Sequence, residues 1–227
     1  MKIPAFKDYT PQSIHDIVFS HGKSESLVKD IVSGLYPFPL AGKTGILLYG
    51  PPGTGKSALA KLLPDAMEQV RSGGPSNFNY WPVTPGANGM TMLANIQNQA
   101  QLIPSASHHY FVLDEVDNLT DGAMAILKSV MNTPACIFVM TTNHLNKIEQ
   151  GVQDRCHCIP FFAAASQKWL PLARRMLADA GIDAISDQHI LNIINPCNGS
   201  ARQIVDALTI MILTVQRKNQ AINTTTL

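Results

Sequence analysis

GPPGTGKS, residues 50–57, fits the pattern G-x-x-x-x-G-K-[ST] of a phosphate-binding loop. It follows the short apolar run GILLYG (45–50) and precedes the helical segment 57–70, which is the order that the motif requires. Glycines let backbone N–H groups converge on phosphates, and the helix N-terminus adds partial positive charge. A chance match in a chain of this length has odds of roughly one in a hundred. We therefore expect a nucleotide site formed by Gly50, Pro51, Pro52, Gly53, Thr54, Gly55, Lys56 and Ser57.

A pair of acids follows the second apolar run, in YFVLDEVDN (110–118). In a parallel sheet this strand end opens onto the same crevice as the phosphate loop. Lys56 would reach the β- and γ-phosphates, and Ser57 and Asp114 would hold Mg²⁺. Glu115 could orient and deprotonate the attacking water, so the pair favours hydrolysis. The role of Asp117 is left open.

Short apolar runs alternate with helical patterns up to about residue 162. We expect strands at 45–50, 110–115, 135–143 and 157–162 and around NYWPV (79–83), with helices at 57–70, 90–102 and 122–132. After residue 162 the pattern is helical only, with segments at 166–181 and 186–195 and a last helix from Ala201, preceded by an S-x-x-Q capping box. Pro171 must lie in a first helical turn. The sequence predicts an α/β P-loop NTPase domain (1–162) with a parallel sheet, then a small all-α domain (163–227).

Composition excludes several classes of protein. The 227 residues are 45% hydrophobic and 15% charged, with a formal net charge of +1, so neither long disorder nor a strongly basic nucleic-acid surface is indicated. The apolar runs are too short to span a membrane. Cys156, His157 and Cys158 lack the usual spacing of zinc ligands, and no C-x-x-C pair or signal peptide is recognisable. We expect a soluble protein of the reducing cytoplasm.

Taken together, the motifs resemble those of the AAA+ ATPases, and within them the clamp-loader group of replication factor C small subunits and phage clamp-loader ATPase subunits. The resemblance rests on GPPGTGKS, LDEVD (113–117), TTN (141–143), GVQDRC (151–156) and GSARQ (199–203). YTPQSIHDIVF (9–19) extends it towards the N-terminus. It implies an AAA+ ATPase domain with a helical lid, which uses ATP and Mg²⁺ in a process on DNA.

The resemblance also implies roles for residues outside the phosphate loop. Asn143 matches the sensor-1 residue near the γ-phosphate, although a strand-end amide is the ordinary alternative. Arg202 matches the sensor-2 arginine of the lid, which could otherwise be a solvated residue of a first helical turn. Tyr9 and Pro11 fall in the segment that resembles the group's adenine-side contact.

Arg155 stands in GVQDRCH (151–157), which we interpret as a short polar turn. In clamp loaders a serine-arginine-cysteine motif at this place supplies an arginine finger to the ATP of a neighbouring subunit. Here Asp154 replaces the serine, and it could restrain the guanidinium or cap a turn. A finger acting in trans implies head-to-tail assembly into a ring or spiral, as a homo- or hetero-oligomer.

Clamp-loader subunits usually carry a further helical collar domain, for which this sequence has no counterpart. Either the protein assembles through its ATPase and lid domains alone, or it needs partners, or it does a different AAA+ job. We expect it to act on DNA or a DNA-bound protein such as a sliding clamp. Two alternatives remain open. One is an ATP-dependent assembly on DNA that recruits a partner, as helicase loaders and transposition regulators do. The other is a protein remodeller that grips its substrate with Tyr80-Trp81 or Met90.

Overall fold

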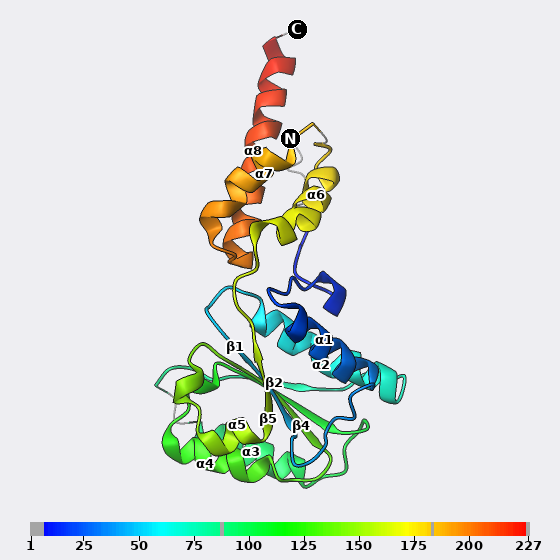
Figure 1. Ribbon diagram of the computed structural model, residues 1–227, viewed down its shortest axis with the longest axis vertical. Coiled ribbons are helices and arrows are strands. Elements are labelled where there is room, and N and C mark those ends of the chain that lie inside the picture. Colours follow the sequence, from blue (N-terminus) through cyan, green and yellow to red (C-terminus); the bar gives the residue numbers. More distant parts are fainter. Residues whose placement is uncertain (1–6, 87–88, 183, 226–227) are drawn as a thin grey trace. The chain divides into compact units, whose positions relative to one another are not determined.

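A five-stranded parallel sheet forms the centre of the larger part of the protein (Figure 1). The computed structural model describes the backbone of residues 7–86, 89–182 and 184–225, with side chains as far as residue 218. The strand order is β2-β3-β4-β1-β5, and every pairing is parallel. The strands are β1 Gly45–Tyr49, β2 Asn79–Pro82, β3 His109–Asp114, β4 Cys136–Thr142 and β5 Cys156–Pro160. All five expected strands are present.

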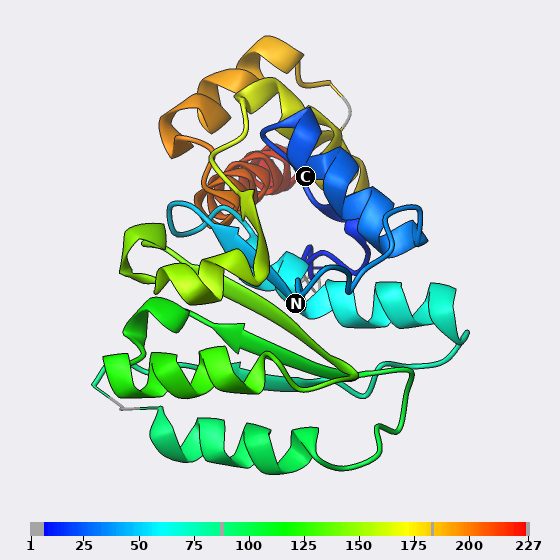
Figure 2. The same ribbon diagram turned by 60° about the horizontal axis from the view of Figure 1, so that its bottom comes forward.

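Both faces of the sheet are covered by helices, which is why its central strands are continuously apolar. Helices α1 (Gly22–Ser33) and α2 (Lys56–Arg71) cover one face, with side chains such as Ile46 and Val139 beneath them. Helices α3 (Met90–Ala100), α4 (Asp121–Val130) and α5 (Gln150–Asp154) cover the other, over Leu47 and Phe138. Figures 1 and 2 show α3 and α4 together against this second face.

Two helices differ from the sequence analysis. Helix α1 was not expected, because its mixed polar sequence buries only Ser24, Val28 and Ile31. The predicted polar turn at 151–157 is wrong: α5 ends at Asp154, Arg155 is its C-cap, and β5 begins at Cys156. Five residues are too few to give a recognisable helical period.

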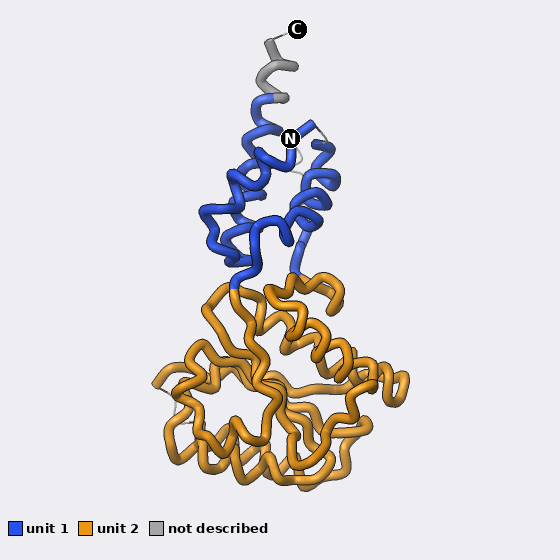
Figure 3. The backbone as a smooth tube through the Cα atoms, viewed as in Figure 1, with its two compact units in different colours: residues 1–10, 163–227 blue, residues 11–162 orange. Residues whose placement is uncertain are grey.

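The chain forms two compact units, Pro11–Phe162 and a helical unit of Ala163–Leu227 with Met1–Thr10 (Figure 3). Residues 1–10 are predicted from the sequence to belong to the α/β domain, whereas here the Tyr9 hydroxyl and the Lys7 ammonium donate to Asp179 Oδ2, at 3.2 and 3.1 Å. The helices of this unit are α6 Leu170–Asp179, α7 Asp187–Ile194 and α8 Ala201–Thr225. Pro171 lies in the first turn of α6, and the Ser200 hydroxyl caps α8 by accepting from Gln203 N at 3.5 Å.

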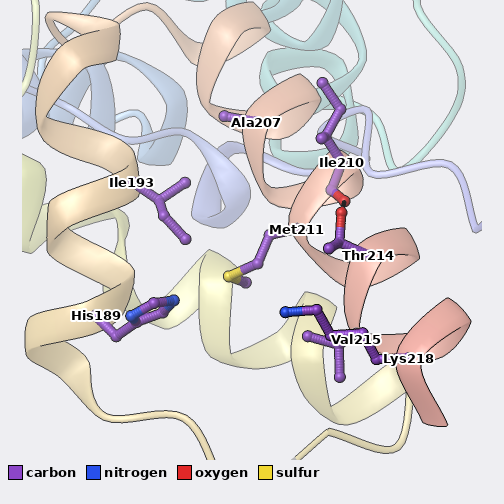
Figure 4. Close-up of a pocket in the computed structure, with 8 residues that line it drawn as sticks. All are labelled: His189, Ile193, Ala207, Ile210, Met211, Thr214, Val215 and Lys218. Atoms are coloured by element: carbon purple, nitrogen blue, oxygen red, sulfur yellow. Dashed lines mark hydrogen bonds between the residues drawn. The ribbon is translucent and has the colours of Figure 1, made fainter.

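A hollow of about 460 Å³ lies between α7 and α8 (Figure 4). Its lining is mostly apolar, and Met211 points into the space between the two helices. The lining residues are His189, Ile193, Ala207, Ile210, Met211, Thr214, Val215 and Lys218. None of them is a candidate for nucleotide binding in the sequence analysis. No helix in the described ranges is both long enough and apolar enough to traverse a bilayer.

Glu68 is a fully buried carboxylate that ties α2 to β3 and to the loop before it. It accepts hydrogen bonds from Ser107 N at 2.8 Å, Ser72 Oγ at 2.6 Å and Tyr110 Oη at 2.7 Å, and a further one from Ser107 Oγ. Burial by itself raises the pKa of this carboxyl, but the hydrogen bonds from Ser107, Ser72 and Tyr110 lower the pKa to about 2. A buried charge is tolerated here because each oxygen has donors.

The lowered pKa of Glu68 predicts acid sensitivity. Its folded pKa of about 2 lies below the ordinary 4.5, so its stabilisation is complete above pH 4.5 and is lost as the pH falls towards 2. The contribution is about 3 kcal/mol at pH 6 and falls by about 2 kcal/mol by pH 3. We expect the difference in free energy of unfolding between wild type and Glu68→Gln to shrink by that amount, measured by urea unfolding. A difference that does not change with pH would contradict this account.

Candidate active site

The phosphate loop depends on glycine at both of its ends. Gly50, directly after β1, has φ +149°, and a Cβ there would lie 2.3 Å from the carbonyl oxygen of Phe161. Gly55 has φ +104° and is the N-cap of α2, with no side chain capping the helix. The first amides of an α-helix have no intrahelical acceptor. The N-terminus of α2 is therefore available to bind an anion.

Lys56 is enclosed by the loop and is only 6% exposed. Its Nζ donates to the carbonyl oxygens of Gly50 at 2.8 Å and Pro51 at 2.7 Å. Burial lowers the pKa of this ammonium to about 8, while nearby carboxylates, Asp114 first, act in the opposite direction. The amine is therefore mostly protonated at neutral pH and adds a positive charge to the anion site.

Three hydroxyl groups hold the Asp114 carboxylate at the end of β3. Ser57 Oγ donates to Oδ1 at 2.8 Å, Thr141 Oγ1 donates to the same oxygen, and Tyr80 Oη donates to Oδ2 at 2.7 Å. Burial, and then the bond to Asp114, raise the pKa of Tyr80. A serine hydroxyl beside a carboxylate provides the oxygen ligands that Mg²⁺ prefers, so Ser57 and Asp114 fit the expected metal.

Glu115 extends from the same strand end but points into solvent. Its backbone is left-handed, with φ +60° and ψ +50°, which is uncommon for a residue other than glycine. Its amide donates to Thr141 Oγ1 at 3.0 Å, and its carboxylate accepts from Asn118 Nδ2 at 3.4 Å. Strained backbone of this kind is often found at functional positions. An exposed carboxylate beside the candidate metal ligand Asp114 can accept a proton from water.

Asn143 lies next to the phosphate loop. With Gly50, Pro51 and Pro52 it lines a hollow of about 510 Å³. Asp117 fixes this strand end, since its Oδ1 accepts from Thr142 Oγ1 at 2.9 Å and from Asn143 N at 3.3 Å. Asp117, whose role the sequence left open, therefore positions the expected sensor residue.

Arg155 lies at the other end of the strands. Cys156 pairs with Gly45, so Arg155 comes immediately before the first paired residues of β5 and β1. The phosphate loop begins after the last residue of β1, five residues beyond Gly45. At 3.3 Å per residue, the loop therefore begins about 16 Å along the strand from Gly45. The structure thus brings Ser57, Asp114, Glu115 and Asn143 together at the carboxyl ends of the strands. Arg155 lies at the opposite, amino ends.

Asp154 does not bind the Arg155 guanidinium in the described structure. Its Oδ1 accepts from Gln150 Nε2 at 2.7 Å, within α5. Arg155 instead donates from Nε to Asn132 Oδ1 at 2.8 Å and from Nη1 to the carbonyl oxygen of Gly151 at 2.7 Å. Restraint of the guanidinium, one of the two roles considered for this acid, does not fit this structure; the other role, capping a turn, is not shown by the side-chain bond to Gln150.

The remaining expected residues belong to two different units. Tyr9 and Arg202 lie in the helical unit, and Pro11 begins the α/β unit. The Tyr9 hydroxyl is bonded to Asp179, and burial raises its pKa. Arg202 is an exposed residue in the first turn of α8.

Tyr80 and Thr141 are partners of Asp114 that the sequence did not predict. Tyr80 was considered as a substrate-gripping aromatic of a protein remodeller, but it lies in β2 with its hydroxyl on Asp114, and Lys61 Nζ lies 4.0 Å from the centre of its ring. Trp81, its neighbour, packs against the hydrophobic core. The TTN motif at the end of β4 was the only sequence signal for Thr141.

Comparison with known proteins identifies a family and several relatives of this chain. The model of the family described as "ATPase family associated with various cellular activities (AAA)" matches residues 46–163, just over half of the chain. Replication factor C small subunit 2 of Pyrobaculum islandicum is 26% identical over 213 residues, covering 92% of this chain and 63% of the relative. Replication factor C small subunit of Methanocella arvoryzae is 30% identical over 152 residues, covering 65% and 44%. The chain thus spans less than two thirds of the length of these relatives.

Among solved structures, the Thermotoga maritima RuvB Holliday junction branch migration motor resembles this chain, with a TM-score of 0.69. The sequence identity is 16%, and the match covers 92% of this chain and 67% of RuvB. At this identity the similarity concerns the fold alone. It agrees with the parallel sheet and the helical region that follows it.

Proposed function

The chain belongs to the AAA family of ATPases, and from this premise we propose that it binds ATP with Mg²⁺ at residues 50–57 and hydrolyses it to ADP and phosphate. Lys56 and the first amides of α2 bind the β- and γ-phosphates, and Ser57 and Asp114 would hold the metal. Mg²⁺ held there would supply neutralisation of the phosphate charge. Glu115 accepts a proton from the attacking water, and Asn143 orients that water beside the γ-phosphate.

The position of Arg155 supports a role at the nucleotide of a neighbouring subunit. Since Arg155 and the phosphate loop lie at opposite ends of the strands, the guanidinium is remote from the phosphates bound by its own chain. It acts instead on the nucleotide of a neighbouring subunit. Such a contact is heterologous, so the subunits assemble head to tail into a ring or a spiral. Arg202, in the helical unit, contacts the γ-phosphate from the lid.

The process that this assembly drives is associated with DNA. The most direct support is the similarity to replication factor C small subunits along 92% of the chain, at 26% identity. The client is DNA itself or a DNA-bound protein such as a sliding clamp. With a formal net charge of +1, each subunit offers DNA little attraction, so binding depends on several copies acting together.

Steady-state ATPase rate, measured at rising protein concentration with and without primed DNA, tests this function. The rate per subunit should climb with concentration, because each site needs a neighbour, and should rise again on DNA. A rate that is independent of concentration would contradict head-to-tail completion of the site. A concentration-dependent rate that DNA leaves unchanged would contradict the DNA role and favour an assembly driven by a protein partner.

A further inference from the structure

The Arg155 side chain is oriented by its own chain but only partly hydrogen-bonded. Nε donates to Asn132 Oδ1 at 2.8 Å, and Nη1 donates to the carbonyl oxygen of Gly151 at 2.7 Å. A guanidinium carries five N–H donors in a fixed plane. Within the described residues, Nη2 has no hydrogen-bond partner. These two bonds therefore fix the direction of the planar group and leave donors for another molecule.

The backbone that carries Arg155 is also held firmly. Its carbonyl oxygen accepts from Thr44 N at 3.0 Å and Gly45 N at 2.9 Å. Lys43 Nζ donates to the carbonyl oxygens on either side, of Asp154 at 3.0 Å and Cys156 at 2.8 Å. Both ends of the long arginine side chain are thus restrained, which lowers the entropy lost when it docks on a second molecule.

Both acceptors of the guanidinium are uncharged. A carboxylate in their place would neutralise the arginine and weaken its attraction to phosphate. The nearest carboxylate in sequence, Asp154, is instead bonded to Gln150 at 2.7 Å. The Asn132 side-chain amide and the Gly151 carbonyl oxygen orient the guanidinium without neutralising it. Its full positive charge therefore remains available to attract phosphate.

We propose that Asn132 is a positioning residue for Arg155, directing the free guanidinium N–H groups to the nucleotide phosphates of a second copy of this chain. This rests on the proposed function of Arg155 in trans. Asn132 is exposed in the turn after α4 and adds nothing to the hydrophobic core, so its substitution should not unfold the protein. Its loss should lower turnover without changing ATP affinity, because its own chain's nucleotide site is untouched.

The test is a double-mutant cycle of Asn132→Ala and Arg155→Ala, read as kcat at saturating protein and as the Kd for ATP. We expect Asn132→Ala to lower kcat about tenfold, since a finger displaced by a fraction of an ångström loses much of its effect. The Kd should stay unchanged, and the substitution should have no effect in the Arg155→Ala background. Asn95→Ala, an exposed asparagine on α3, is the matched control and should behave as wild type.

Three outcomes would overturn the assignment or its premise. A wild-type kcat for Asn132→Ala, alongside a large loss for Arg155→Ala, would show that the finger needs no positioning by Asn132. An equal loss in the Arg155→Ala background would show that Asn132 acts by another route. A wild-type kcat for Arg155→Ala itself would overturn the proposed finger, and with it the role of Asn132.

Discussion

Arg155→Ala should bind ATP as wild type does and lose about 10³-fold in turnover. A cation on the transferring phosphoryl group stabilises charge that develops in the transition state, and such arginines contribute about 10³–10⁵ in rate. Binding should survive because the groups that we propose to bind the phosphates, Lys56 and the N-terminus of α2, lie at the opposite end of the strands from Arg155. The measurements are the Kd for ATP and kcat at a protein concentration where the wild-type rate per subunit has reached its plateau.

Lys29→Ala is a suitable control for loss of positive charge. Lys29 is 51% exposed on α1 and pairs with Glu25 at 2.7 Å, so its removal should leave the rate unchanged. If Arg155→Ala hydrolysed ATP at the wild-type rate, Arg155 would have no catalytic role. If it instead lost ATP affinity in the dilute, unassembled protein, it would act within its own chain.

Glu115→Gln should lower turnover by about 10²–10⁴-fold while retaining ATP. Glutamine has the shape of glutamate and can still accept a hydrogen bond from Asn118, but it cannot take a proton from water at neutral pH. With ATP bound and hydrolysis blocked, the variant should remain in the assembled state. Size-exclusion chromatography with ATP and DNA measures this directly, beside single-turnover hydrolysis.

Asp121→Asn is the control for Glu115→Gln, because Asp121 is an exposed acid at the start of α4, outside the site. It should hydrolyse ATP normally. Near-normal hydrolysis by Glu115→Gln would remove Glu115 from the mechanism and leave the left-handed backbone at that position without a functional explanation.

The arrangement of the candidate nucleotide site could be predicted from the sequence because its parts are local. The glycines of residues 50–55, the lysine and the acidic strand end each carry their own signal, and parallel strands bring their carboxyl ends together. The partners of Asp114 could not be predicted in the same way. Tyr80 and Thr141 reach it across neighbouring strands, and only the strand order and register place those hydroxyls on the carboxylate.

The surroundings of Arg155 were predicted least well. Its helix, α5, is too short to show a period, and its acceptor Asn132 is 23 residues earlier in the chain. The sequence suggested Asp154 as the partner because it is adjacent, but side chains of consecutive residues in a helical turn point in different directions. The tertiary fold therefore determines which groups orient the arginine.

The central claim is that each active site is completed by a neighbouring chain, and mixing two inactive variants tests it most directly. Arg155→Ala retains Glu115, and Glu115→Gln retains Arg155. In a mixed head-to-tail assembly, an Arg155→Ala site that has a Glu115→Gln neighbour contains every group that hydrolysis needs. The account predicts that an equimolar mixture hydrolyses ATP far faster than the average of the two variants measured alone. A mixture that only reaches that average, under conditions where the chains co-assemble, would contradict completion of the site in trans.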